Sequence, residues 1–261
     1  MSPRVPPFVL LVLLAVAASA PASAQISTDR PGLGAGAAVV PRGAFQVEAG
    51  LPQATRINGP EVAGVSGNLT TFSFPLALRY GVTETVEFRA STSLYDVTRI
   101  AIDTPAGGDS DSDGDVGFDA VEVGAKIQLA TNGPVVAIVP SIMIPTTESA
   151  QLAGAFRAVA EWTLTDRLGL STVLGATVTD GEPDVQLAAE AVAGVNASLA
   201  DAFSAYAEIA AYPQDGGTPV LTGAGILFLV SPDVQLDASF DVGLNDDAPD
   251  LLFGAGLSFR L

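Results

Sequence analysis

An alternation of apolar and polar residues with a period of two constrains this chain more than any other feature of its sequence. The stretch VQLDASFDVGL, residues 234–244, places aliphatic and aromatic residues at one set of alternate positions, and Gln, Asp and Ser at the other. Blocks of this kind, about ten residues long, recur between clusters of Gly, Pro, Asp and Asn. Because successive side chains of a strand point to opposite faces, this pattern predicts an all-β protein.

The pattern predicts about twelve strands. They cover residues 44–51, 69–80, 86–97, 118–130, 134–144, 153–164, 168–178, 184–199, 203–212, 219–230, 234–244 and 251–261. The connections alternate in length, with tight turns at 81–85, 131–133, 165–167, 200–202 and 231–233, and longer links at 52–68, 98–117, 145–152, 179–183, 213–218 and 245–250. This alternation is typical of a transmembrane antiparallel up-and-down β-barrel, which has short periplasmic turns and longer extracellular loops.

An even number of strands places both chain ends on the side of the short turns, so both termini are expected in the periplasm of a Gram-negative bacterium. Four aromatic residues close to tight turns, Tyr80, Trp162, Phe203 and Phe228, are expected to face the membrane interface. A soluble β-sandwich is the alternative fold. The unbroken aliphatic stripe and the small, mostly uncharged polar face favour the barrel.

Residues 1–24 are expected to be a signal peptide, and residues 25–261 a single barrel domain. Arg4 precedes a short apolar run, and Ala22-Ser23-Ala24 matches a small-residue cleavage site. An uncleaved anchor helix is the alternative. Without these residues the chain has 10 basic and 29 acidic residues, a net charge of −19. This charge would repel phosphates and disfavours a nucleic-acid partner.

The chain contains no cysteine and no histidine. Their absence excludes disulfides, zinc sites built from Cys and His, and nucleophilic catalysis that depends on a histidine base. We therefore expect neither an enzyme nor a resident cofactor. Outer-membrane lipid, a small solute and the barrel-assembly machinery are the expected partners.

Both ends of the chain resemble a known family. The stretches ISTDRPGLGAGAAVVPRGAFQVEAG (residues 26–50) and GLNDDAPDLLFGAGLSFRL (residues 243–261) resemble the outer-membrane barrels assigned as transporters to the MetA pathway of phenol degradation. The stretch GDVGFDAVEVGAKIQL (residues 114–129) is similar to a further family strand, with two extra residues. The resemblance implies a channel or carrier for small organic compounds, aromatic ones among them. Such barrels usually end on an aromatic residue that the assembly machinery recognises, whereas this chain ends on Leu261. This departure bears on the efficiency of assembly and not on the fold.

The charged residues of the alternating blocks, together with Gln46, are expected to point into the lumen. These positions are Gln46, Glu48, Arg79, Glu87, Arg89, Glu122, Lys126, Arg157, Glu161, Glu190, Glu208, Asp237, Asp241 and Arg260. One hypothesis is that they line a pore and favour cations or neutral solutes. The alternative is that they pair across strands and fill the interior, which makes a non-conducting structural or surface-interaction barrel.

Two further motifs stand apart from the strands. Asp29, Arg30, Pro31 and Gly32 carry the N-terminal family motif, for which a periplasmic capping turn is favoured over a constriction inside the lumen. The stretch DSDSDGDV, residues 109–116, offers Asp109, Asp111, Asp113 and Asp115 at spacings like those of a calcium-binding loop. Because no register supplies both the glycine at position 6 and the glutamate at position 12, we expect a solvated extracellular loop. A weak divalent-cation site is the alternative.

Overall fold

A computed structural model describes residues 25–59, 65–104, 107–116, 120–131, 133–148, 150–181 and 184–261. The predicted signal peptide lies outside the described residues. The described part of the chain contains no helix that is both long enough and apolar enough to cross a membrane.

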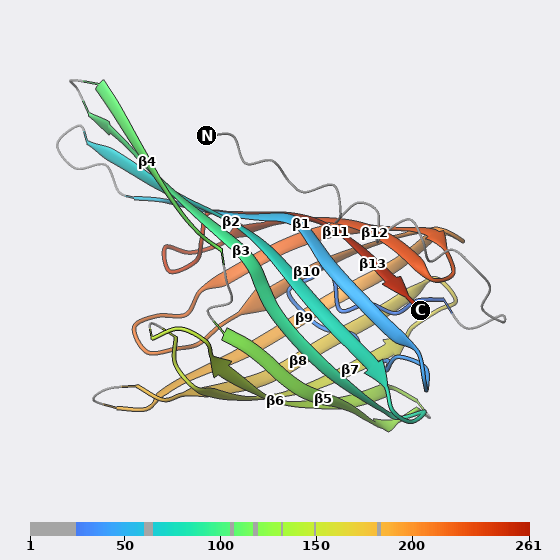
Figure 1. The fold of residues 1–261 in the computed structure, drawn as a ribbon. Coiled ribbons are helices and arrows are strands. Elements are labelled where there is room, and N and C mark those ends of the chain that lie inside the picture. The colour runs from blue at the N-terminus through green and yellow to red at the C-terminus, as the bar shows by residue number, and fades with distance from the viewer. Residues whose placement is uncertain are drawn as a thin grey trace.

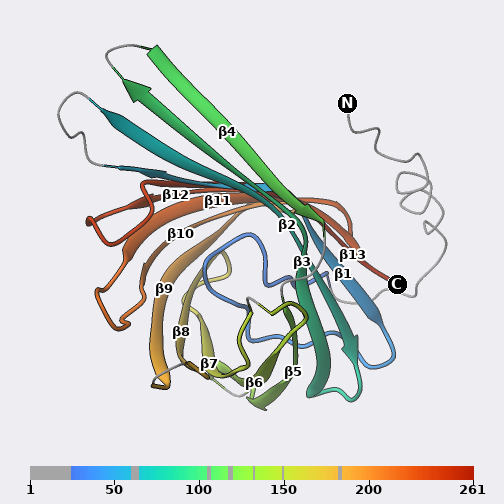
Figure 2. The same ribbon diagram turned by 60° about the vertical axis from the view of Figure 1, so that its left-hand side comes forward.

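Thirteen strands form one antiparallel sheet that closes on itself (Figures 1 and 2). They are β1 (Phe45–Asn58), β2 (Ser66–Gly81), β3 (Val86–Thr104), β4 (Gly107–Val116), β5 (Ala120–Ala130), β6 (Val135–Pro145), β7 (Ala153–Thr163), β8 (Leu168–Thr179), β9 (Gln186–Ala200), β10 (Phe203–Ala211), β11 (Val220–Ser231), β12 (Val234–Gly243) and β13 (Leu251–Arg260). β1 pairs with both β2 and β13, which closes the ring. β3 pairs with β5 near its start and with β4 near its end, so β4 stands outside a barrel of twelve strands. The predicted fold is confirmed.

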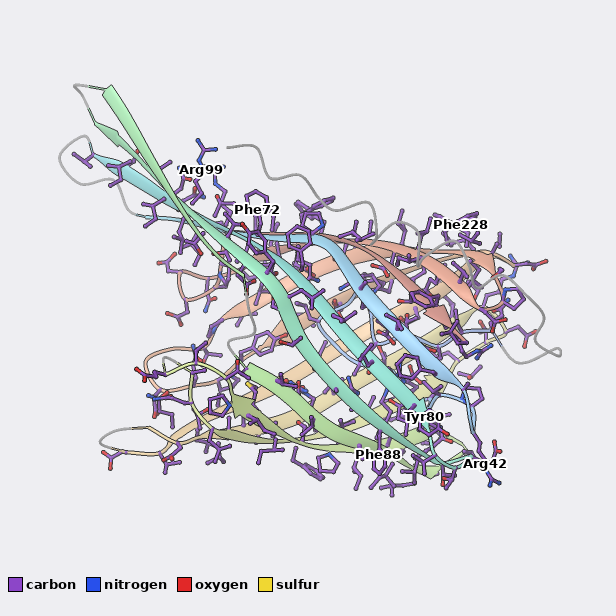
Figure 3. The ribbon with its side chains drawn as sticks, viewed as in Figure 1. Arg42, Phe72, Tyr80, Phe88, Arg99 and Phe228 are labelled. Atoms are coloured by element: carbon purple, nitrogen blue, oxygen red, sulfur yellow. The ribbon has the colours of Figure 1, made fainter. Side chains whose placement is uncertain are left out.

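The barrel is apolar outside and polar inside, the reverse of a soluble protein. On β12 the side chains of Leu236 and Phe240 are exposed, whereas those of Asp237 and Asp241 between them are buried. Leu174 on β8 is 63% exposed, while Glu87 and Lys126 are fully buried. Figure 3 shows Phe72, Tyr80, Phe88 and Phe228 projecting from the outer surface. A soluble sandwich would bury the apolar face, so this alternative is wrong.

Strands β1 to β4 extend past the barrel as a projecting sheet (Figure 1). Residues 98–117, predicted as a long link, belong mainly to this sheet, because β3 reaches Thr104 and β4 covers the acidic stretch. Asp111 is the pairing partner of Ile100, and Asp113 that of Thr98. The expectation of a loop is therefore wrong, whereas the solvation of the acidic side chains stays a prediction. Aspartate has a low strand propensity, but here the backbone hydrogen bonds to β3 override it.

The short connections gather at one end of the barrel and the longer ones at the other, as predicted. The N-terminal segment, residues 25–44, enters from the short-turn end, where the amide of Ile26 donates to the carbonyl of Pro232 at 2.8 Å. It loops through the lumen, where Figure 2 shows it enclosed by the ring of strands. It returns to the same end, where Arg42 bridges to Gly81. The lumen is thus occupied by the protein's own chain.

Candidate functional site in the barrel lumen

The thirteen charged residues predicted to face inward all lie on the inner wall, where some are buried and others are partly buried. Buried ones are Glu48, Arg79, Glu87, Lys126, Glu208, Asp237, Asp241 and Arg260. Partly buried ones are Arg89, Glu122, Arg157, Glu161 and Glu190. The structure brings them into separate groups rather than one continuous network. Whether they line a solute path remains a prediction.

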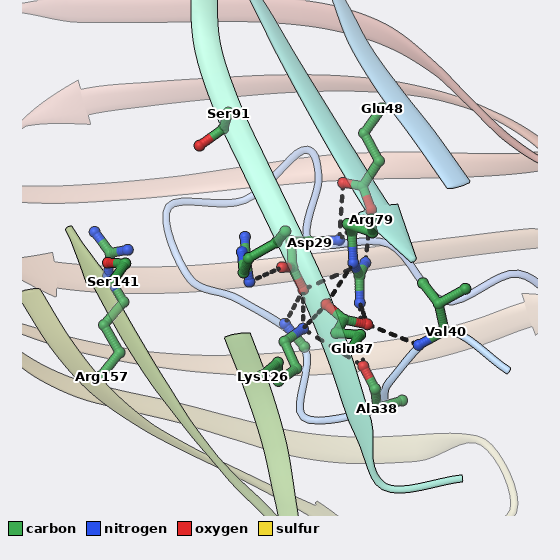
Figure 4. A network of polar contacts seen from close by, with 12 residues as sticks. Asp29, Ala38, Val40, Glu48, Arg79, Glu87, Ser91, Lys126, Ser141 and Arg157 are labelled. Carbon is green, nitrogen blue, oxygen red and sulfur yellow. Dashed lines mark hydrogen bonds and ion pairs between the residues drawn. The ribbon is translucent and has the colours of Figure 1, made fainter. Parts of the chain in front are cut away.

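Asp29 is the centre of the largest group (Figure 4). Its Oδ1 accepts a hydrogen bond from Lys126 Nζ at 2.7 Å, and its Oδ2 pairs with Arg89 Nη1 at 2.8 Å. Arg79 Nη1 lies 3.7 Å from Oδ1. The amide of Gly36 also donates to Oδ1, at 3.0 Å, so the carboxylate folds the segment back on itself.

Nearby cations keep the carboxyl group of Asp29 ionised. Burial on its own raises the pKa of this carboxyl, but Arg79, Lys126 and Arg89 oppose it, and the pKa lies well below the usual 3.8. Asp29 is therefore ionised at neutral pH, and it is a counterion for cations that β2, β3 and β5 bring to the same place.

Arg79 joins the same group to two strands and to the segment. Its guanidinium donates to Glu87 Oε1 at 2.8 Å and to Glu48 Oε1 at 2.6 Å. It also donates to the carbonyls of Ser27 and Ala38, at 3.1 and 3.2 Å. Five donors in a fixed planar fork make arginine suited to holding several acceptors at once.

Other parts of the N-terminal segment are tied to other strands. Arg30 Nη2 pairs with Asp237 Oδ1 on β12 at 3.2 Å. The amide of Leu33 donates to Glu208 Oε1 on β10 at 2.7 Å, and the amide of Val40 donates to Glu87 Oε2 at 2.7 Å. The favoured expectation of a periplasmic capping turn is therefore wrong, because the family motif lies inside the lumen.

Small residues let the segment pack this closely. A Cβ at position 32 would lie 3.1 Å from the carboxylate oxygens of Glu208. Ala37 is fully buried against an apolar patch of the inner wall, formed by Ala137, Val139, Val159, Val173, Val192 and Ala210. Sequence reasoning missed this patch, because it assigned the inner face to polar residues. The available signal was the run GLGAGAA, residues 32–38, in which every residue except Leu33 is glycine or alanine.

A second ionic group lies on the wall formed by β5, β7 and β9. Arg157 Nε donates to Glu190 Oε1 at 2.8 Å, and its Nη1 lies 3.4 Å from Glu122 Oε1. Ser141 donates to the same Glu122 oxygen at 2.6 Å. Arg260, next to the C-terminus, pairs instead with Asp233 in the turn between β11 and β12, at 2.6 Å.

Several cavities among the described residues adjoin the N-terminal segment. One of about 360 Å³ is lined mainly by apolar side chains near the long-loop end, with Leu33, Ala188, Tyr212 and Leu221 among them. A second, about 290 Å³, lies beside Arg30, Pro75 and Glu122. The third, about 110 Å³, is more polar and includes Glu161, Tyr206 and Glu208.

The backbone of the acidic motif lies in a strand rather than in a loop. Asp109, Asp111, Asp113 and Asp115 occupy alternate positions of β4, so they do not form the tight loop that calcium sites of this spacing require. No group of three or more acidic residues suited to a metal ion occurs among the described residues. Weak divalent-cation binding stays a prediction, checked by melting the protein with millimolar calcium.

Comparison with known proteins agrees with this architecture. An outer membrane channel from Pseudomonas putida F1 is 13% identical, with a TM-score of 0.66 over 89% of this chain and 99% of that one. The NanC porin is 10% identical, with a TM-score of 0.55 over 83% of this chain and all of that one. The KdgM porin is 7% identical, with a TM-score of 0.53 over 80% of this chain and 98% of that one. These likenesses show the fold.

No curated protein sequence matches the chain significantly. A family model described as "Putative MetA-pathway of phenol degradation" matches residues 28–261, which begin just before the N-terminal motif and include every strand. The chain therefore belongs to the MetA-pathway of phenol degradation family, and it is an outer-membrane β-barrel of twelve strands.

Proposed function

We propose that this barrel carries small, largely apolar organic solutes, aromatic ones among them, across the outer membrane without changing them chemically. The observation that carries the proposal is the cavity of about 360 Å³ inside the long-loop end of the barrel. Its size is within the usual range for small-molecule sites of about 300–1,000 Å³. Aliphatic walls formed by Leu33, Leu221 and Leu252 suit an apolar solute.

Polar groups at the edge of this cavity would orient a solute that has a hydroxyl group. Tyr212, Gln214 and Glu190 line it together with the aliphatic residues. Few polar groups in a mainly apolar wall are typical of sites that select by shape and by one or two hydrogen bonds. A structural relative also supports a transport role, because the Pseudomonas putida barrel is described as a channel.

The experiment is a binding measurement by saturation-transfer NMR with phenol and refolded protein. Ala188→Trp would fill the cavity from β9 and should abolish the signal. Ala191→Trp is the matched control, because Ala191 is exposed on the same strand. Unchanged phenol binding in Ala188→Trp would overturn the assignment of this cavity.

The orientation of the barrel belongs to the same proposal. Both termini would lie in the periplasm, because the chain ends at Leu261 where the turns are short. A tag after Leu261 should then be inaccessible to antibody on intact cells; labelling of intact cells would contradict this. The barrel-assembly machinery would insert the chain, so depleting that machinery should leave it unfolded in the periplasm.

A non-conducting structural barrel is the second candidate, and one observation favours it. The N-terminal segment is held in the lumen by strands on several sides, through Lys126, Arg89, Asp237 and Glu208. Transport requires this segment to move, whereas a structural role does not. Conductance that stays at background under every condition, even after removal of the segment, would favour the structural role.

A further inference from the structure

One face of the projecting sheet carries two arginines at neighbouring positions. Strand register pairs Arg56 on β1 with Thr70 on β2, and Thr70 with Arg99 on β3. Residues directly opposite each other in antiparallel strands lie on the same face of a sheet, so these three side chains share one face. The two arginines stand two strands apart, about 10 Å between backbones, and both are exposed.

This face continues the lipid-facing surface of the barrel. Phe72 lies two residues from Thr70 on β2, so its side chain points the same way, about 7 Å nearer the barrel. Phe72 projects from the outer surface, and Arg99 lies farther along the projecting sheet (Figure 3). Beyond the arginines the same face is polar, with Asn58 paired with Asn68. Because aromatic residues border the apolar band of outer-membrane barrels, the band ends at Phe72 on these strands, and the arginines lie directly beyond it.

The other basic residues lie elsewhere. Apart from Arg4, the chain has ten basic residues, all of them in its described part. Six pair with acids, namely Arg30, Arg79, Arg89, Lys126, Arg157 and Arg260. Arg42 and Arg167 are exposed at the short-turn end. The long-loop end exposes several acids, Asp180, Asp215, Asp246 and Asp247 among them. This end therefore repels free anions in general, and an anion held there needs a second attraction.

The arginines suit a phosphate. Arg56 Nε donates to the amide oxygen of Asn58 at 3.0 Å, and this neutral partner leaves the charge of the guanidinium in place. A guanidinium has five donors in a planar fork that matches the oxygens of a phosphate. Both arginine side chains are long enough to reach over Thr70, whose hydroxyl is a further donor.

We propose that Arg56, Thr70 and Arg99 bind the phosphates of a glycolipid of the outer leaflet, the lipid A part of lipopolysaccharide. In lipid A the phosphates lie directly above the acyl chains. Acyl chains packed on the apolar band beside Phe72 therefore bring the phosphates to the arginines. This apolar contact is the second attraction, which a free anion lacks. The assignment rests on the proposed orientation, with the long-loop end extracellular, and does not depend on which solute the barrel carries.

The test is native mass spectrometry of the refolded barrel, released from detergent micelles after titration with diphosphoryl lipid A. Replacing both arginines, Arg56→Gln with Arg99→Gln, should weaken binding by about 25-fold, because each basic residue at an anionic lipid surface contributes about fivefold. The matched control is Arg42→Gln with Arg167→Gln, which removes the same charge from the short-turn end and should leave binding unchanged. Equal binding by the two double variants would overturn the proposal.

Further measurements identify the bound group. Arg56→Lys with Arg99→Lys keeps the charge and should keep most of the binding, whereas lipid A stripped of its phosphates should bind the parent as weakly as the glutamine variant. Equal binding of phosphorylated and stripped lipid A by the parent would refute a phosphate site. Equimolar inorganic phosphate should displace none of the lipid, and displacement would show a site for free anions instead.

The outcome can be separated from that of the transport proposal. Binding in detergent requires neither an oriented barrel nor a conducting one, so loss of the lipid site leaves solute transport standing. The tag after Leu261 tests the orientation by itself. A heat-modifiable gel shift first establishes that every variant is folded, which we expect because both arginines are exposed.

Discussion

Asp29 is the residue on which the position of the N-terminal segment most depends. It is the counterion of Lys126, which is fully buried, and of Arg89. Removing one partner of a buried charge group is costly because it leaves the other charge uncompensated. The contribution of Asp29 to the stability of the barrel thus comes as much from neutralising these cations as from its own hydrogen bonds.

Asp29→Asn should release the segment and destabilise the barrel by about 3–5 kcal/mol. Because the chain has no cysteine, a cysteine introduced at Ala35 is a unique reporter. We expect a maleimide to label it slowly in the parent and many-fold faster with Asp29→Asn. Asp166→Asn, in the exposed turn between β7 and β8, should leave the rate unchanged. Equal rates for Asp29→Asn and the parent would show that other contacts hold the segment.

The same residue predicts a pH dependence. Its folded-state pKa lies below the unfolded value of 3.8, so its stabilisation is complete above that value. It is lost progressively as pH falls below 3.8 toward the folded-state pKa. The difference in melting temperature between wild type and Asp29→Asn should therefore be constant near neutral pH and shrink below pH 3.8. A difference that stays constant down to pH 2 would contradict this assignment.

At the scale of elements, each strand separates a lipid face from a lumenal face, and substitutions should follow that division. Leu174→Arg places a charge on the exposed apolar face of β8, which should cost about 2–4 kcal/mol near the membrane midplane. Glu148→Arg, in the exposed connection between β6 and β7, should change stability by less than about 0.5 kcal/mol. Urea unfolding in lipid vesicles measures both. Similar costs for the two would mean that β8 does not face lipid.

The regular strands could be predicted from the sequence, and the irregular segments could not. Strands such as β12 have one apolar and one polar face, so periodicity alone locates them within a few residues. β4 was missed because its aspartates and serines carry no apolar face, and pairing with β3 decides its conformation. The N-terminal segment was misplaced because a run of glycine and alanine has no period, and its position depends on distant partners such as Lys126 and Glu208.

At the scale of the whole molecule, a closed barrel surrounds a lumen that its own N-terminal segment occupies. Apolar residues face lipid on the outside, while inside the segment lines both the mainly apolar cavity of about 360 Å³ and the smaller one of about 110 Å³. We infer that the lumen is a solute path and that this segment closes it.

The experiment is single-channel conductance in a planar bilayer, comparing the mature protein with a variant that lacks residues 25–40. A heat-modifiable gel shift first establishes that both barrels are folded. We expect small or rare current steps for the mature protein, and large ohmic steps with cation preference for the deletion, because the acids that remain face an open lumen. A folded deletion variant that conducts no current would show that the lumen is no solute path and would leave a structural barrel.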